Sequence, residues 1–192
     1  MRTKSLLTIA LAAAGMLYGA SVYAVDPPTT GPFGTGKITF TGTITNSPCD
    51  IAPGDDAITV PLGQISYRHL KAADDVSDSK PFTIHLQNCA FDANDAVIAG
   101  SAGKMSKVTV SFTGNADANN KGYVNTGNAQ DVAVQLLKSD NHSILTPNTD
   151  ADAQQLQTGN NELNFFARVV ALGASVTPGT VESTVTYTLK YQ

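Results

Sequence analysis

The carboxyl-terminal ten residues are Ser183-Thr184-Val185-Thr186-Tyr187-Thr188-Leu189-Lys190-Tyr191-Gln192. Apolar side chains occupy every second position from Val185 to Tyr191, and threonine or lysine occupies the positions between them. Successive side chains of a strand point to opposite faces, so this alternation is typical of a half-buried β-strand. The chain is therefore predicted to end in a strand with one apolar face.

The same period of two recurs upstream of this strand. Its apolar tracks cover residues 38–44, 58–62, 82–86, 108–112, 132–136 and 163–169. Turn-forming residues lie between them, including Pro53-Gly54 and Pro178-Gly179. No long stretch has a helical period, and residues 67–73 allow a helical turn at most. Many short strands separated by turns predict an all-β sandwich.

The composition fits one folded domain and excludes several functional classes. The chain has 192 residues, of which 42% are hydrophobic and 15% are charged, which argues against disorder. Its net charge of −4 lacks the basic excess that nucleic-acid binders show, so no nucleic-acid partner is expected.

The first 24 residues have the pattern of a cleaved signal peptide. Arg2 and Lys4 precede an apolar run over residues 6–16, and Val22-Tyr23-Ala24 supplies a small-residue cleavage site. The apolar run is shorter than the roughly 20 residues that a membrane-spanning helix needs. We therefore expect residues 1–24 to be removed on export.

The chain has two cysteines, Cys49 and Cys89. In an exported protein such a pair is first interpreted as a disulfide. A redox or metal-binding pair is the alternative, but the C-x-x-C spacing and an accompanying histidine cluster are both absent.

Candidate catalytic and metal-binding patterns are incomplete. His69, His85 and His142 lie far apart without ligand spacing, and no G-x-S-x-G occurs. Residues 100–104 resemble part of a phosphate-binding loop, but Met105 follows the lysine where Ser or Thr is required. A calcium-loop pattern beginning at Asn148 lacks its glycine and its glutamate. We expect no enzyme activity, cofactor or metal.

Several stretches form an ordered set along the chain. They are the track Ile38-x-Phe40-x-Gly42-x-Ile44, the spacing of Cys49 and Cys89, Pro61-Leu62-Gly63, and residues 82–89, 122–137, 164–168 and 176–192 with the penultimate Tyr191. Together, and after a signal peptide, they resemble the structural pilins of the chaperone–usher type, similar to the major subunits of type 1 and related fimbriae.

The resemblance implies a particular fold and a pair of complementary segments. Residues 47–192 would form a pilin domain, an immunoglobulin-like sandwich that lacks its last strand and so leaves an apolar groove. Residues 25–46 would form an amino-terminal extension that completes the groove of a neighbouring subunit by strand addition. Ile38, Phe40 and Ile44 would enter that groove, with Gly42 at a point that leaves no room for a side chain. One wall of the groove would carry Val185, Tyr187, Leu189 and Tyr191.

The resemblance also implies partners and a location. The expected partners are other copies of the chain, related pilin subunits, a periplasmic chaperone and an outer-membrane usher. The expected location is an extracellular fimbrium on the cell surface, reached through the periplasm. A tip adhesin of this family carries an additional binding domain, for which a chain of this size leaves no room. We therefore expect the repeating shaft subunit, with adhesion mediated indirectly, and keep a minor adaptor or anchor subunit of similar size as the alternative. A different-class alternative is a monomeric exported β-sandwich that binds a ligand, although the chain has no Trp for an aromatic platform.

Overall fold

The computed structural model describes residues 31, 34–94 and 96–192. It divides the chain into two compact units, one through Thr43 and one from Ile44 to Gln192. The predicted signal peptide, residues 1–24, lies outside the described residues. None of the helices in the part of the chain that the structure describes is long and apolar enough to cross a membrane.

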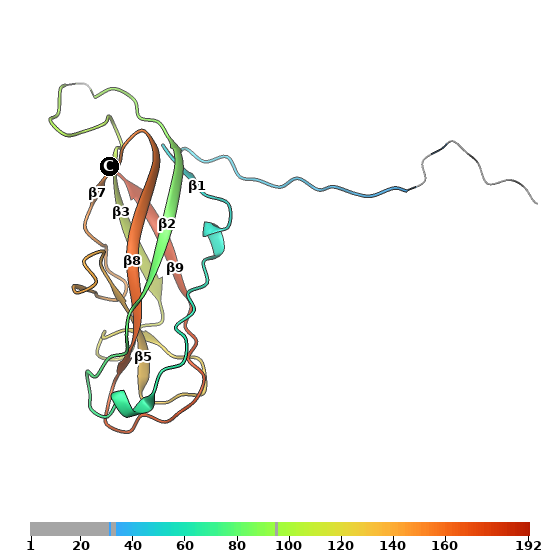
Figure 1. Cartoon of the computed structure of the whole chain (residues 1–192). Helices are drawn as coiled ribbons and strands as arrows, with labels where there is room; N and C mark the ends of the chain where they lie inside the picture. Colours follow the sequence, from blue (N-terminus) through green and yellow to red (C-terminus); the bar gives the residue numbers. More distant parts are fainter. Residues whose placement is uncertain (1–30, 32–33, 95) are drawn as a thin grey trace, which may run out of the picture. The chain divides into compact units, whose positions relative to one another are not determined.

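The second unit is a sandwich of two antiparallel sheets (Figure 1). The larger sheet contains β1 (Asp50–Ile51), β2 (Lys80–Cys89), β8 (Gly159–Ala171), β5 (Val132–Leu137) and β4 (Tyr123–Val124), in this spatial order. A sixth strand, β6 (Ile144–Leu145), also pairs with β5. The smaller sheet contains β7 (Gln154–Gln155), β3 (Lys107–Gly114) and β9 (Val185–Tyr191). Two 3₁₀ turns, η1 (Asp55–Ala57) and η2 (Tyr67–His69), lie between β1 and β2.

Five of the seven alternating tracks form strands, namely those that fall in β2, β3, β5, β8 and β9. Residues 38–44 and 58–62 alternate in the same way but are not strands. An alternating pattern indicates that a segment has one apolar face. A strand also needs a neighbouring strand that shares its backbone hydrogen bonds. These two predictions of a strand are therefore wrong for the isolated chain.

The core lies between the two sheets and is made by the inward side chains of the long strands. Ile84 and Leu86 of β2, Val108 and Val110 of β3, and Leu163 and Phe165 of β8 are almost completely buried. Cys49 and Cys89 are buried beside them and form a disulfide. The backbone N–H of Ala90 donates to the carbonyl of Pro48 at 2.9 Å, next to this bridge. The start of the domain is thus fixed to the end of β2.

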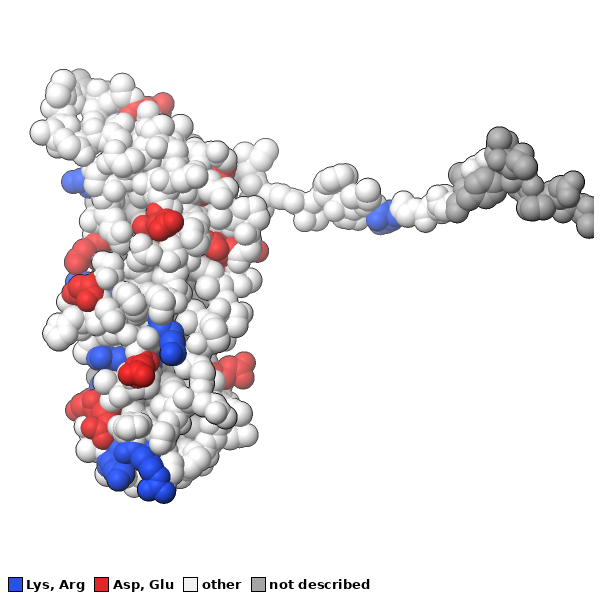
Figure 2. Space-filling model, in the orientation of Figure 1, with Lys and Arg blue, Asp and Glu red and all other residues white. Residues whose placement is uncertain are grey.

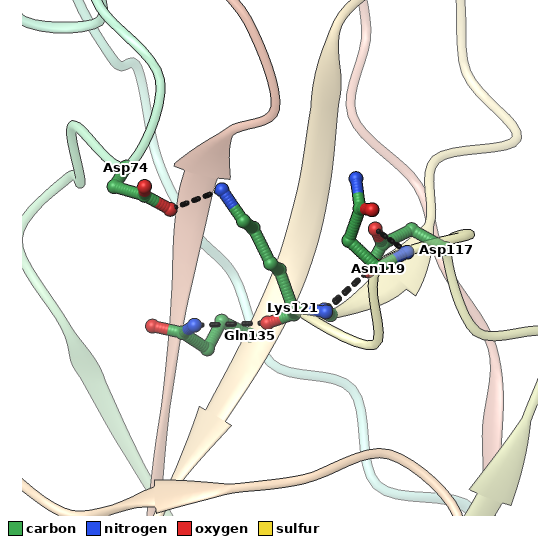
Figure 3. A network of polar contacts seen from close by, with 6 residues as sticks. Asp74, Asp117, Asn119, Lys121 and Gln135 are labelled. Carbon is green, nitrogen blue, oxygen red and sulfur yellow. Dashed lines mark hydrogen bonds and ion pairs between the residues drawn. The ribbon is translucent and has the colours of Figure 1, made fainter.

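A polar network secures the loop between β3 and β4 (Figure 3). Asp117 is only 7% exposed, and its carboxylate accepts the backbone N–H groups of Asn119, Lys121 and Gly122 at 2.9, 2.6 and 2.8 Å. Charge-assisted bonds of this kind are among the strong ones in proteins. The ammonium of Lys121 reaches Asp74 at 2.5 Å, in the segment that follows η2. The network therefore connects the β3–β4 loop to the η2 region.

Gln135 of β5 extends the same network into the larger sheet. Its amide donates to the carbonyl of Lys121 at 2.8 Å, and its side-chain oxygen accepts Arg168 Nε of β8 at 2.8 Å. Partial burial lowers the pKa of Arg168 from its ordinary value. The end of the domain that carries η2 is thus held by hydrogen bonds from three separate elements.

Candidate functional site: an apolar groove beside an edge strand

A groove of about 1480 Å³ opens onto the core of the domain. Its floor is apolar and is supplied by Phe82, Ile84, Phe112, Val134, Leu136 and Ala167. Phe82 and Phe112 belong to different sheets, and their ring centroids lie 6.1 Å apart in an edge-to-face arrangement. A segment that enters the groove therefore meets the hydrophobic core itself.

One wall of the groove is formed by β9 and the segment that precedes it, residues 179–184. The smaller sheet has the order β7-β3-β9, so β9 is its last strand. Its inner edge pairs with β3 along the whole strand, from Val108↔Tyr191 to Gly114↔Val185. Its outer edge pairs with no other strand of the described residues. An unpaired edge of this length is a template for an additional strand.

The opposite wall is formed by residues 56–66. Ile58, Val60 and Leu62 in this wall point their half-buried side chains toward the core, and the residues between them are more exposed. This is the alternating track that does not form a strand. The groove therefore separates two extended segments, each of which has a core-facing apolar side.

The apolar face of β9 is only partly covered. Val185, Tyr187, Leu189 and Tyr191 all lie on this face and pack against the core, yet each remains half-buried. The β3 residues paired with Tyr187, Leu189 and Tyr191 are almost completely buried, namely Phe112, Val110 and Val108. The difference between the two strands indicates that the edge beside β9 lacks a covering element.

A tyrosine closes the groove at the end nearest η1. The hydroxyl of Tyr187 donates to the backbone carbonyl of Asp55 at 2.9 Å, and so connects the two walls. The side chain of Asp55 in turn lies 2.8 Å from His85 Nδ1 and accepts the backbone N–H of His85. Burial raises the pKa of Tyr187, and the nearby Asp55 and Asp56 raise it further.

The other end of the domain carries a second, smaller apolar hollow of about 200 Å³. It is lined by Ile65, Tyr67, Leu70, Val176, Pro178 and Val181, among others. Tyr67 is half-exposed there, and the guanidinium of Arg68 lies 5.6 Å from the centre of its ring. In Figure 1 this end, with η2 and the loop before β9, is opposite the end that carries β1.

The segment before the domain does not bury its apolar side chains, which are instead exposed to solvent. Residues 34–43 are exposed throughout. Ile38 and Phe40 are 78% and 89% exposed, and Ile44, the first residue of the second unit, is fully exposed at 102%. No heavy atom would lie within 4 Å of a Cβ placed on Gly42. Burying such side chains is worth about 1.5–3 kcal/mol each, so their exposure favours association with another molecule.

The predicted residues therefore fall into three places, which are the exposed extension, the disulfide and the final strand β9. Cys49 and Cys89 form the disulfide, and the four apolar residues of the final strand lie on one face of β9. Of these four, Val185 and Tyr187 line the groove, whereas Leu189 and Tyr191 lie further along the same face. The sequence did not reveal Asp55 as the partner of Tyr187, because that contact joins positions 132 residues apart.

Charge does not concentrate over the surface shown in Figure 2. Acidic and basic side chains are interspersed, and uncharged surface separates them. A protein that binds nucleic acid through its backbone phosphates presents a continuous basic face instead. The face shown therefore has no such continuous basic surface.

Known proteins share both the sequence and the fold. The family model described as "Fimbrial protein" matches residues 38–192. The Pap fimbrial major pilin protein of Escherichia coli is 30% identical over 192 residues, covering 98% of this chain and 99% of that protein.

Two solved structures agree with these sequence matches. A chain from the structure of a chaperone–usher pilus superposes with a TM-score of 0.67 at 29% identity, covering 86% of this chain and all of that one. The crystal structure of the P pilus rod subunit PapA gives a TM-score of 0.61 at 26% identity, covering 76% of this chain and all of that one. These matches confirm the predicted all-β pilin fold and the prediction that the chain is a structural protein rather than an enzyme. The chain belongs to the fimbrial protein family, and it is a fimbrial subunit of the chaperone–usher class.

Proposed function

We propose that this chain polymerises by inserting residues 38–44 of one copy into the groove and along the unpaired edge of β9 of the next copy. The observation that carries this proposal is that one chain has both an exposed apolar segment and an apolar groove. Large apolar side chains are exposed on the extension, and an apolar groove lies open beside the unpaired edge of β9. An added strand gains backbone hydrogen bonds from the edge and apolar contacts from alternate side chains.

The direction of insertion follows from the sheets already present. Every strand pair in the described domain is antiparallel, and antiparallel pairing is slightly more stable per residue. An extension that runs antiparallel to β9 would place Ile44 near Val185, at the start of that strand. Alternate positions would then place Gly42 beside Tyr187 and Phe40 beside Leu189.

This register gives Gly42 a physical role. The ring of Tyr187 already spans the space between the two walls, because its hydroxyl reaches the carbonyl of Asp55. A side chain at the position above that ring would meet it, whereas glycine would not. Ile38, Phe40 and Ile44 would point the same way, to either side of the crowded point.

We further propose that the subunit passes through the periplasm before it joins the fibre on the cell surface. An unpaired edge and an open apolar groove are aggregation hazards during transit. A periplasmic chaperone that covers them, and an outer-membrane usher that receives the subunit, fit this need. Cleavage after Ala24 would leave residues 25–46 as the extension and 47–192 as the pilin domain. The repeating shaft subunit is the role we favour, because the chain is similar over nearly its whole length to the Pap fimbrial major pilin protein.

The test is to compare Gly42→Arg with the unmodified chain in fimbriated cells. Material sheared from the surface is run on SDS gels with and without heating. Strand-exchanged polymers are expected to be kinetically stable, so the unmodified chain should give a ladder that collapses on strong heating. Gly42→Arg should leave the folded subunit in the periplasm and remove the ladder.

The matched control is Thr41→Arg, which adds the same charge one residue away on the opposite face of the extension. It should polymerise as the unmodified chain does. Normal ladders from Gly42→Arg would refute insertion of this segment. A soluble, chaperone-free monomer from the unmodified chain would favour the monomeric ligand-binding alternative. Few copies per fibre would favour a minor adaptor or anchor subunit over the shaft.

A further inference from the structure

The loop between β2 and β3, which the structure describes over residues 90–94 and 96–106, projects from the β1 end of the domain (Figure 1) and has an apolar tip. Val97 is fully exposed at 102% and Ile98 is 56% exposed. Exposed single apolar residues are common on protein surfaces, but two neighbours at a loop tip form a point of contact. The pilin fold and the proposed strand exchange do not by themselves use these two side chains.

The base of this loop is held by a dense set of hydrogen bonds. Ser106 is almost completely buried. Its hydroxyl oxygen lies 3.0 Å from the hydroxyl oxygen of Ser101 and 3.0 Å from Gln155 Nε2. The backbone N–H of Lys104 donates to the carbonyl of Asp92 at 2.7 Å. A Cβ on Gly103 would lie 2.4 Å from that same carbonyl, so the two arms of the loop pack backbone against backbone. A fixed base can present the tip in one direction.

The loop also starts where the extension leaves the domain. The Pro48–Ala90 hydrogen bond and the Cys49–Cys89 disulfide place residue 49 beside the first residues of the loop. Only residues 45–48 separate Ile44 from Cys49, which is a span of at most about 18 Å when fully extended. A copy that holds Ile44 in its groove must therefore lie close to this end of the donor domain.

The receiving copy presents the opposite end of its domain at that junction. In the antiparallel register, Ile44 lies near Val185, and the segment before Val185 leads into the small hollow around Tyr67 and Val181. This end is apolar, half-exposed at Tyr67, and fixed by the Asp117–Lys121–Asp74 network. The two surfaces that meet are thus an apolar tip and an apolar hollow.

We infer that Val97 and Ile98 pack on the surface around Tyr67 and Val181 of the copy that receives this chain's extension. The contact rests on the proposed strand exchange and adds a second interface to it. It would restrict the angle between successive domains, which the four-residue linker alone leaves free. The partner is a second copy of this chain, because both surfaces belong to it.

The experiment places the photo-reactive residue p-benzoylphenylalanine at position 97 of the full chain in assembled fimbriae. Irradiation should give covalent subunit dimers, and peptide mapping should join position 97 to residues 65–70 or 176–181. The matched control is the same residue at position 144. Ile144 is also an exposed apolar residue, at 48%, but its pairing with Leu137 places it next to Phe166, about 24 Å along β8 from the Gly159 end. That control should not link to either segment.

A second variant tests the receiving surface without disturbing the core. Tyr67→Glu should remove most of the cross-link from position 97 and leave the polymer ladder intact, whereas Ile144→Glu should leave both unchanged. If polymer forms but position 97 links to another segment or to no subunit, the tip contact is wrong and strand exchange stands. If no polymer forms from the unmodified chain, strand exchange fails and the contact fails with it.

Discussion

The hydroxyl of Tyr187 and the backbone carbonyl of Asp55 lie 2.9 Å apart and join the two walls of the groove. One belongs to the edge strand β9 and the other to the 3₁₀ turn η1. The contact closes the groove at one end and leaves it open toward residues 62–66 and 179–184. It also gives a physical basis for the position of glycine in the extension.

Removing this contact should weaken the domain measurably but modestly. Tyr187→Phe deletes the hydroxyl and keeps the ring, so the expected loss is about 1 kcal/mol of unfolding free energy. Urea denaturation of the purified subunit measures it. Tyr67→Phe removes a hydroxyl from a half-exposed ring and should change the midpoint little. Equal stability of Tyr187→Phe and the unmodified subunit would show that the contact is not stabilising.

Tyr187 of the receiving copy should limit the size of the side chain that the extension can have at position 42. Gly42→Ala is expected to slow polymerisation, because the added methyl group meets the Tyr187 ring in the receiving copy. Tyr187→Val shortens that side chain, so the double variant should recover part of the lost rate. The rate is measured by the growth of the heat-sensitive ladder. Additive losses in the double variant would contradict a direct steric contact between these positions.

The buried tyrosines should make the folded subunit sensitive to alkaline pH. Burial raises the pKa of Tyr123 and Tyr187 above the ordinary value of 10.0. The folded state therefore holds these protons more tightly than the unfolded state does. This stabilisation is complete below about pH 10 and is lost as the pH rises through the folded pKa values.

Urea denaturation at several values between about pH 8 and 11 tests this dependence. The unfolding free energy should decline above about pH 10, and the decline should be shallower in Tyr123→Phe. That variant also loses the hydrogen bond from Tyr123 to the carbonyl of Phe112, so its stability should be lower at every pH. A pH profile identical to that of the unmodified subunit would show that Tyr123 does not contribute to the decline.

Loss of the disulfide should reduce the amount of folded subunit. Closing a loop across the sequence separation of 40 between Cys49 and Cys89 is worth about 4 kcal/mol in the chain-entropy model. The Cys49→Ser, Cys89→Ser double variant should therefore accumulate less in the periplasm and unfold at lower urea concentration. Periplasmic yield by immunoblot gives the first measurement. An unchanged yield would argue against a structural role for the bridge.

Local periodicity predicted the main strands because each of them carries an apolar face toward the core and pairs with another strand of the chain. The tracks in β2, β3, β5, β8 and β9 all meet this condition. Residues 38–44 and 58–62 have the apolar face but no strand to pair with, and the pattern alone cannot distinguish the two cases. The four short strands β1, β4, β6 and β7, of two residues each, carry too few positions for a period to appear.

The groove was harder to predict than the strand beside it. Its floor combines Phe82 of β2 with Phe112 of β3, and only the packing of two sheets brings these rings together. The link between Tyr187 and Asp55 and the network around Asp117 depend on loop conformations that no periodic pattern encodes. The resemblance to pilins implied a groove, whereas the residues that shape its ends came from the structure.

The wall that precedes β9 should tolerate no side chain at Gly179. A Cβ there would lie 2.3 Å from the backbone nitrogen of Ala129, a contact that requires the backbone to move. The Ala129 N–H donates to the carbonyl of Thr180 at 3.0 Å, so that movement would break the bond that supports this wall. Gly179→Ala is expected to cost about 1–3 kcal/mol of unfolding free energy.

Hydrogen exchange distinguishes this local effect from general destabilisation. In Gly179→Ala, the amide of Ala129 should exchange faster relative to amides of the central strand β8, and the ladder should form more slowly because the wall is displaced. Gly34→Ala is the control, since no heavy atom lies within 4 Å of a Cβ at that position. It should change neither stability nor exchange. Uniform acceleration across β8 and Ala129 would instead indicate that Gly179 supports the whole domain and not this wall in particular.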